Sequence, residues 1–160
     1  MIALIAATVV TFKTSPWPGA LLIRPLFEAD ARNVKKRMAG FAPTGIASIL
    51  NETYRPGDRD AKLDIYWPSS ANTDSAFPTI FWLHGGAWIS GHRNDASAFL
   101  QLIAAQGFTV ISVGFSNSPR KMYPTALFQI NDAVAYVQQH ADRLHVNPHM
   151  FAFAGDSSGA

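Results

Sequence analysis

The chain has 160 residues, no cysteine and a formal net charge of +2 at pH 7, and hydrophobic residues make up 48% of it. This length allows one domain or part of one, and the composition is that of a folded globular protein. The lack of cysteine excludes disulfides, thiolate metal sites and a cysteine nucleophile, and the small net charge argues against a nucleic-acid partner.

A basic N-terminal segment, residues 1–43, precedes the main domain. Residues 1–40 have a net charge of +4, whereas the remaining 120 residues have −2. Residues 1–12 are almost wholly apolar but lack the leading positive charge of a secretory signal, and they fall short of the about 20 residues that span a bilayer. We therefore expect a cytoplasmic protein, with export or membrane association as alternatives; the oligomeric state is open.

Residues 20–38 have helical apolar spacing and a basic end. Leu22, Leu26, Phe27, Val34 and Met38 can share one broad face. We expect a cap helix that packs this face on the domain. Peripheral membrane contact through residues 1–40 is the alternative, and Pro25 weakens it.

From residue 44 onward, strands and helices alternate. Strands are predicted at 46–54, 63–67, 79–83, 109–115 and 150–154, and helices at 94–106 and after Pro124. The first two strands are expected to form an antiparallel hairpin. The alternation that follows predicts an α/β fold for residues 44–160, with a mostly parallel sheet and helices on both faces. Functional loops then lie at the carboxyl ends of the strands.

Side-chain spacing predicts which faces of these elements are buried. In strand 63–67, Asp64 and Tyr66 lie on the wetter face. In helix 94–106, capped by Asn94, the inward residues are Phe99, Leu102 and Ile103, and after Pro124 an apolar stripe comprises Leu127, Ile130, Val134 and Val137.

The last six residues, Gly155-Asp156-Ser157-Ser158-Gly159-Ala160, contain the pattern Gly-x-Ser-x-Gly directly after a predicted strand. This pattern is typical of a nucleophile elbow, a strained strand-to-helix turn that exposes a serine. Ser157 is the predicted nucleophile. Gly155 and Gly159 relieve crowding around it, and Asp156 braces the turn.

A second glycine-rich motif, His84-Gly85-Gly86-Ala87-Trp88, follows the predicted strand 79–83. Ester hydrolysis passes through an oxyanion, which backbone N–H groups can stabilise. We predict an oxyanion hole formed by Gly85, Gly86, Ala87 and Ser158, in which Gly86 and Ala87 are the preferred donors of this loop and Gly85 permits the turn. His84 is expected to hold the loop by hydrogen bonding, and Trp88 to wall the pocket. A phosphate-binding loop would need a lysine and a hydroxyl at P-loop spacing, which are absent.

With both motifs, residues 44–160 resemble the α/β-hydrolase esterases of the hormone-sensitive-lipase-like and carboxylesterase type. The segment Leu63 to Pro68 is similar to the family's second strand, residues 84–88 to its HGG loop, and residues 155–160 to its GDSAG elbow. The resemblance implies a serine esterase or lipase for short or medium acyl esters, small-molecule substrates, and no cofactor. An arylformamidase-like amide hydrolase is an alternative, because that group also has HGG-x-W.

The acid and the histidine of the expected triad would follow Ser157, and no residue upstream replaces them. His84 has a loop role, His92 could line the entrance, and His140, His145 and His149 precede the fifth strand. We expect the 160 residues to be the truncated nucleophile and oxyanion part of an esterase. The alternative is an inactive fragment or a non-catalytic interaction module.

Overall fold

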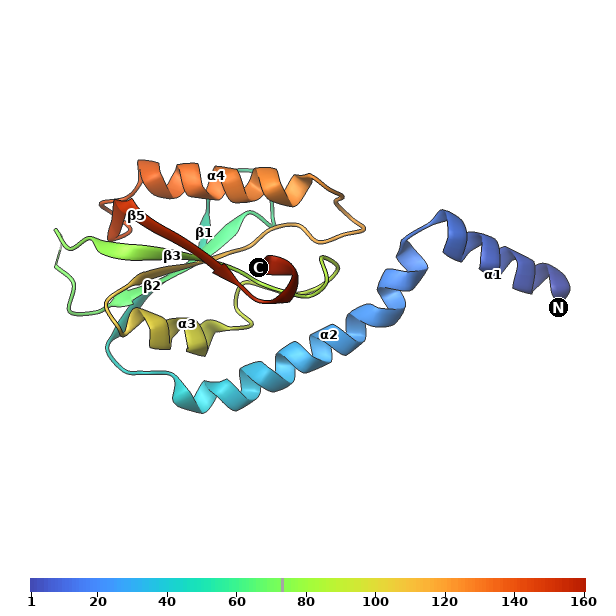
Figure 1. Cartoon of the computed structure of the whole chain (residues 1–160), viewed down its shortest axis with the longest axis horizontal. Coiled ribbons are helices and arrows are strands. Elements are labelled where there is room, and N and C mark those ends of the chain that lie inside the picture. The colour runs from blue at the N-terminus through green and yellow to red at the C-terminus, as the bar shows by residue number, and fades with distance from the viewer. Residues whose placement is uncertain (73) are drawn as a thin grey trace.

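The computed structural model describes residues 1–72 and 74–160, and it contains one five-stranded sheet with helices on both faces (Figure 1). The strands are β1 (Ile46–Thr53), β2 (Lys62–Pro68), β3 (Phe77–Leu83), β4 (Thr109–Val113) and β5 (Val146–Gly155). The helices are α1 (Ile2–Thr14), α2 (Trp17–Met38), α3 (Ser97–Ala104) and α4 (Thr125–Gln139), with short 3₁₀ turns η1 (Ala39–Phe41) and η2 (Ser157–Gly159).

The sheet is mixed, in the order β1-β2-β4-β3-β5. The predicted hairpin is confirmed, because β1 pairs with β2 in antiparallel orientation; β2 also runs antiparallel to β4. Strand β3 pairs in parallel with both β4 and β5, and helices α3 and α4 make the connections between these strands. The α/β class and the helices on both faces are therefore as predicted, and the parallel part of the sheet comprises β3, β4 and β5.

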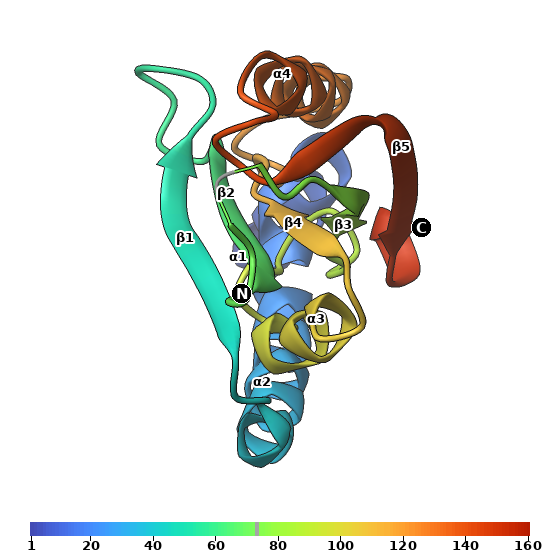
Figure 2. The same ribbon diagram turned by 90° about the vertical axis from the view of Figure 1, so that its left-hand side faces the viewer.

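The main hydrophobic core lies between the sheet and α4. Helix α4 begins after Pro124 and covers one face of the sheet (Figure 2). Its buried side chains pack on apolar residues of β2, β3 and β4. The buried residues of this core include Leu63, Ile65, Phe81, Ile111 and Val113 from the sheet and Ile130, Ala133 and Val137 from the helix. Of the predicted stripe, Leu127 lies outside this core and is exposed.

Helix α3 covers the opposite face of the sheet, and the side of α3 that is buried differs from the prediction. Leu100 and Ala104 are buried against Tyr66 and Val110, with Ile103 beside them. The predicted inward residues Phe99 and Leu102 are instead 40% and 36% exposed. The helix begins at Ser97 rather than at Asn94, and Asn94 makes no capping hydrogen bond. The residues just before α3 include Arg93, which forms a buried ion pair.

That ion pair joins Arg93 to Asp64, and it corrects the prediction of a wetter face on β2. The Arg93 Nε atom lies 2.9 Å from Asp64 Oδ1, and both side chains are buried. Asp64 Oδ1 also accepts a hydrogen bond of 2.9 Å from the Asn51 backbone N–H, and the Arg93 carbonyl accepts one of 2.7 Å from Ser112 Oγ. Asp64 is therefore a satisfied interior carboxylate that fastens residues 91–94 to the sheet.

The N-terminal residues form two helices, α1 and α2, separated at Ser15 and Pro16. Helix α2 starts three residues earlier than predicted and continues through Pro25. It lies along the α3 side of the sheet, whereas α1 extends away from the sheet (Figure 1). No helix in the described residues is both long and apolar enough to cross a membrane.

Strand β5 is longer than predicted, because it begins at Val146 instead of Met150. Val146 pairs with Phe77, and the next paired residues are Phe151 and Thr79. The register shift absorbs the additional residues 147–150, among which Pro148 cannot donate a ladder hydrogen bond.

We predict that replacing Arg93 with methionine will lower the free energy of unfolding by about 3 kcal/mol, because the Asp64 carboxylate would stay buried without its cation. Urea unfolding measures this loss. Arg55→Met is the matched control, since Arg55 forms an exposed pair with Asp132 at 3.5 Å, and it should cost less than about 1 kcal/mol. Equal losses in the two variants would contradict the role given to the buried pair.

Candidate active site

The two predicted motifs meet because β3 and β5 are neighbours in the sheet. Leu83, the last residue of β3, pairs with Gly155, the last residue of β5. The segments that leave these strands therefore start side by side at the carboxyl edge of the sheet. They are far apart in sequence, and this pairing brings the His84–Trp88 turn next to Ser157.

Close backbone packing at this edge requires glycine at two positions. A Cβ atom on Gly155 would lie 2.7 Å from the Leu83 carbonyl oxygen, and one on Gly159 would overlap the same oxygen. Both distances are shorter than real Cβ contacts allow. The glycines of the Gly-x-Ser-x-Gly pattern thus allow the turn to lie directly on the end of β3.

Ser157 stands on a tight turn between β5 and η2. Its φ is 51°, in the left-handed region that is unfavourable for a residue with a Cβ atom. The turn is closed by hydrogen bonds from the Gly159 N–H to the Asp156 carbonyl (2.9 Å) and from the Asp156 N–H to the Leu83 carbonyl (3.3 Å). This geometry is that of an elbow, as the pattern predicts.

Asp156 connects the elbow to the glycine-rich turn. Its Oδ1 atom accepts a hydrogen bond of 2.8 Å from the Gly85 backbone N–H. This contact agrees with the bracing role expected for Asp156. It also corrects the set of oxyanion donors, because the Gly85 N–H is engaged within the protein. Gly86, Ala87 and Ser158 remain as the predicted donors.

The turn from Gly86 to Trp88 has an unusual backbone. Gly86, Ala87 and Trp88 have consecutive positive φ values of 117°, 54° and 60°. The Gly86 carbonyl accepts hydrogen bonds from the N–H groups of Ile89 (3.1 Å) and Ser90 (3.0 Å). Within residues 1–72 and 74–160, we find no acceptor for the N–H groups of Gly86, Ala87 or Ser158. Of these three residues, Gly86 lines the cavity that contains Ser157, and the role of all three as oxyanion donors stays a prediction.

His84 is a buried part of this turn. Its Nδ1–H donates a hydrogen bond of 2.9 Å to the Gly85 carbonyl, and its ring stacks on Phe115 with 4.2 Å between centroids. Burial lowers the pKa of His84, and the hydrogen bond to Gly85 opposes this only in part. The ring is therefore neutral near pH 7 and holds the turn in place, in line with the loop role expected for it.

A cavity of about 490 Å³ opens above Ser157. One wall is α2, which contributes Phe27, Asp30, Ala31, Val34 and Met38. Trp82, Ala96 and Phe99 form an apolar wall on the opposite side, and His84, Gly85, Gly86, Asp156 and Ser157 form the floor. The volume is in the range of small-molecule sites. Helix α2 thus borders the cavity, but four of the five residues of the predicted apolar face, Leu22, Leu26, Phe27 and Val34, are exposed. The prediction that this whole face packs on the domain is therefore wrong.

Trp88 does not line this cavity, contrary to the prediction. It lines a second cavity of about 390 Å³ together with Met122, Tyr123 and Leu127. The Trp88 ring lies 5.8 Å from that of Phe115 between centroids. Its backbone N–H lies 3.4 Å from Ser158 Oγ and donates to it.

The described residues contain no general base in contact with Ser157, because its hydroxyl makes no hydrogen bond to any of their side chains. His92 does not line the cavity either; it contacts Arg93 and Asn94. His140 and His145 precede β5, which begins opposite Phe77 and ends opposite Leu83 of β3, so they lie at the far end of the sheet, roughly 20 Å from the elbow. His149 lies within β5 and not before it, contrary to the prediction. No cluster of three metal-ligating side chains occurs in the part of the chain that the structure describes.

Sequence reasoning missed three residues around the site. Asp30 and Phe99 line the cavity, and Arg24 contacts the glycine-rich turn from α2. Phe99 was predicted to face inward, whereas the buried residues of α3 are Ala98, Leu100 and Ala104. No local pattern marks Arg24, since its partners are 65 and 94 residues away in the sequence.

The BD-FAE family model matches residues 63–160, which contain the sheet from β2 onward and both motifs. Among curated proteins, the acetyl esterase of Salmonella paratyphi A is 31% identical over 156 residues, covering 91% of this chain and 43% of the relative. The chain thus spans less than half the length of the curated relatives it matches.

Solved structures agree on the fold. Esterase B from Lactobacillus rhamnosis superposes with a TM-score of 0.76 at 21% identity, covering 88% of this chain and 46% of that protein. A hyperthermophilic esterase from the archaeon Pyrobaculum calidifontis gives a TM-score of 0.70 at 25% identity, with 88% and 44% coverage. The described fold matches the corresponding part of both proteins.

We predict that Gly159→Ala will lower the free energy of unfolding by at least about 2 kcal/mol, because the new Cβ would overlap the Leu83 carbonyl. Gly40→Ala serves as the control, since a Cβ there meets no atom within 4 Å; it should change stability by no more than about 0.5 kcal/mol. Chemical denaturation of both variants checks this. Equal stability would mean that the elbow can move off β3 at little cost.

Proposed function

The chain belongs to the BD-FAE family, and from this premise we propose that it forms the nucleophile and oxyanion part of a serine carboxylic-ester hydrolase. The observation that supports the proposal is Ser157 on a strained turn that shares one cavity with Gly86, while the N–H groups of Gly86, Ala87 and Ser158 have no acceptor within the described residues. A nucleophile and a set of converging backbone donors are the two parts that acyl transfer needs at the carbonyl group.

In the proposed reaction, Ser157 Oγ attacks the carbonyl carbon of an ester and its proton passes to a general base. The carbonyl oxygen becomes an oxyanion that accepts hydrogen bonds from the three N–H groups. Collapse of this intermediate expels the alcohol, which takes up the proton, and leaves an acyl group on Ser157. Water then attacks the acyl group and releases the carboxylic acid. These steps require no cofactor.

We propose that the general base and its acidic partner come from chain beyond residue 160. The relatives named as acetyl esterases are more than twice as long as the matched part. In α/β-hydrolases the acid and the histidine follow the serine in the chain. We call the 160 residues together with that segment the complete enzyme. His84 is not the base, because its ring is buried and hydrogen-bonded to the Gly85 carbonyl.

Short acyl esters are the proposed substrates. The cavity above Ser157 has apolar walls of Phe27, Val34 and Phe99, which suit an alkyl chain. Its volume of about 490 Å³ accommodates a small ester. The name of the acetyl esterase relatives points to the same acyl class.

We expect Ser157→Ala to lower kcat/KM of the complete enzyme for p-nitrophenyl acetate by at least about 10⁴-fold, because the covalent step is lost. Ser48→Ala, an exposed position on the edge strand β1, is the control and should keep full activity. Absorbance of released p-nitrophenol measures both rates. Full activity in Ser157→Ala would refute the assignment of the nucleophile.

The separate 160-residue chain should give no stoichiometric burst of p-nitrophenol, because the described residues place no base at Ser157. It should also self-associate, since β5 lies at the edge of the sheet and exposes Phe153. Stopped-flow absorbance and light scattering test the two expectations. A monodisperse monomer with a burst that disappears in Ser157→Ala would contradict them.

A further inference from the structure

The turn that contains Gly86 and Ala87 has backbone φ angles that are unfavourable for residues with a Cβ atom. Ala87 and Trp88 both have a Cβ atom and both adopt left-handed φ values. Each such residue costs about 1–2 kcal/mol. The turn therefore keeps its shape only if the surrounding structure fixes it.

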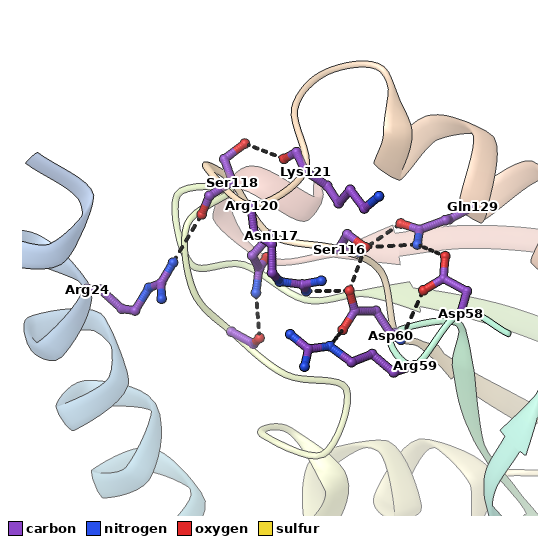
Figure 3. Close-up of polar contacts among 12 residues, drawn as sticks. Arg24, Asp58, Arg59, Asp60, Ser116, Asn117, Ser118, Arg120, Lys121 and Gln129 are labelled. Carbon is purple, nitrogen blue, oxygen red and sulfur yellow. Dashed lines mark hydrogen bonds and ion pairs between the residues drawn. The ribbon is translucent and has the colours of Figure 1, made fainter. Parts of the chain in front are cut away.

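Arg24 of α2 reaches this turn from outside the sheet. Its Nε–H donates a hydrogen bond of 2.8 Å to the Ile89 carbonyl, and its Nη2–H donates one of 3.1 Å to the Ser118 carbonyl. Figure 3 shows the guanidinium of Arg24 directed from α2 toward the Ser118 loop. One planar group thus joins two loops that are not adjacent in sequence.

These two loops also contact each other. The Ser118 N–H donates a hydrogen bond of 2.7 Å to the Trp88 carbonyl, and Asn117 Nδ2 donates one of 3.1 Å to the Gly91 carbonyl. The loop at residues 116–118 thus holds the chain at the end of the glycine-rich turn and just after it, and Arg24 binds Ile89 between these two contacts.

The 116–118 loop is in turn fixed to the domain by a polar network (Figure 3). The Ser116 N–H donates to Gln129 Oε1 (2.8 Å), and Ser116 Oγ donates to Asp60 Oδ2 (2.6 Å), which also pairs with Arg120. Burial by itself raises the pKa of Asp60, but the hydrogen bonds and the charge of Arg120 outweigh it and lower this pKa. Asp60 is thus a carboxylate near neutral pH, and the loop is a firm support.

We propose that Arg24 is a positioning residue, which fastens the cap helix α2 to the strained turn and keeps the Gly86 and Ala87 N–H groups directed at Ser157. Phe27, one turn further along α2, lines the substrate cavity. The position of α2 beside the cavity and the orientation of the oxyanion donors therefore both depend on the hydrogen bonds of Arg24. The effect of Arg24 on catalysis rests on the proposed function, whereas its attachment of α2 to the turn does not.

A role limited to anchoring the helix accounts less well for these contacts. Ala20, one turn before Arg24, is the buried residue of α2. Arg32, on the same helix, makes only an exposed pair with Glu28 at 3.8 Å. Arg24 instead binds one carbonyl within the glycine-rich segment and one on its support.

The structural test is hydrogen–deuterium exchange in the Ser157→Ala background of the complete enzyme, where no turnover is needed. The reporters are the amides of Ser90 and Ser118, which donate within the turn and between the two loops. Arg24→Met keeps the aliphatic stem and removes both donors. It should speed exchange at these amides by about tenfold. Arg32→Met should leave exchange unchanged.

The catalytic test uses p-nitrophenyl acetate and Ser157-containing enzyme. Arg24→Met should lower kcat by about 10- to 100-fold with little change in KM, because misplaced donors weaken binding of the transition state more than of the substrate. Arg24→Lys, which can supply one of the two hydrogen bonds, should fall between the wild type and Arg24→Met.

Unchanged exchange at Ser90 and Ser118 in Arg24→Met would overturn the proposal. So would a rise in KM at constant kcat, because that result assigns Arg24 to the cavity wall alone. Failure of the proposed function has a different signature: activity would survive in Ser157→Ala, while the exchange result for Arg24→Met would still hold.

Discussion

The parallel pairing of β3 with β5 is the contact on which the candidate site depends. It puts Leu83 opposite Gly155, so that the Leu83 carbonyl accepts the Asp156 N–H and touches the positions of two glycines. The elbow is thus built directly on the end of the neighbouring strand. Ser157 and the His84–Trp88 turn come together because their strands do, and the core that holds α4 on the sheet keeps those strands in register.

The sequence predicted those parts of the molecule that have a local cause. Gly155 and Gly159 identify a tight turn after a strand, and Gly85 and Gly86 identify another, so both motifs and the succession of strands along the chain were predicted. The order of the strands within the sheet was not. The hairpin of β1 and β2 and the α/β class followed from alternation and periodicity. Ser157 was assigned from the same pattern and remains a proposed nucleophile.

The remaining features depend on contacts between distant residues. Asp64 looked solvent-facing because its buried partner Arg93 is 29 residues away. The Gly85 N–H looked available because Asp156, its acceptor, lies 71 residues away. Hydrophobic periodicity predicts which face of a helix or strand is buried, but not which residues pack against that face.

Helix α2 lines the cavity and also, through Arg24, contacts the segment of the strained turn. This double role affects how such proteins can diversify. Substitutions in α2 that enlarge or reshape the cavity would shift the helix, and Arg24 would pass the shift to the turn. Substrate range and reaction rate are then expected to change together during evolution. Lineages that adapt to new esters would acquire paired changes, one in the helix and one among residues 86–91 or 116–118, that restore the alignment.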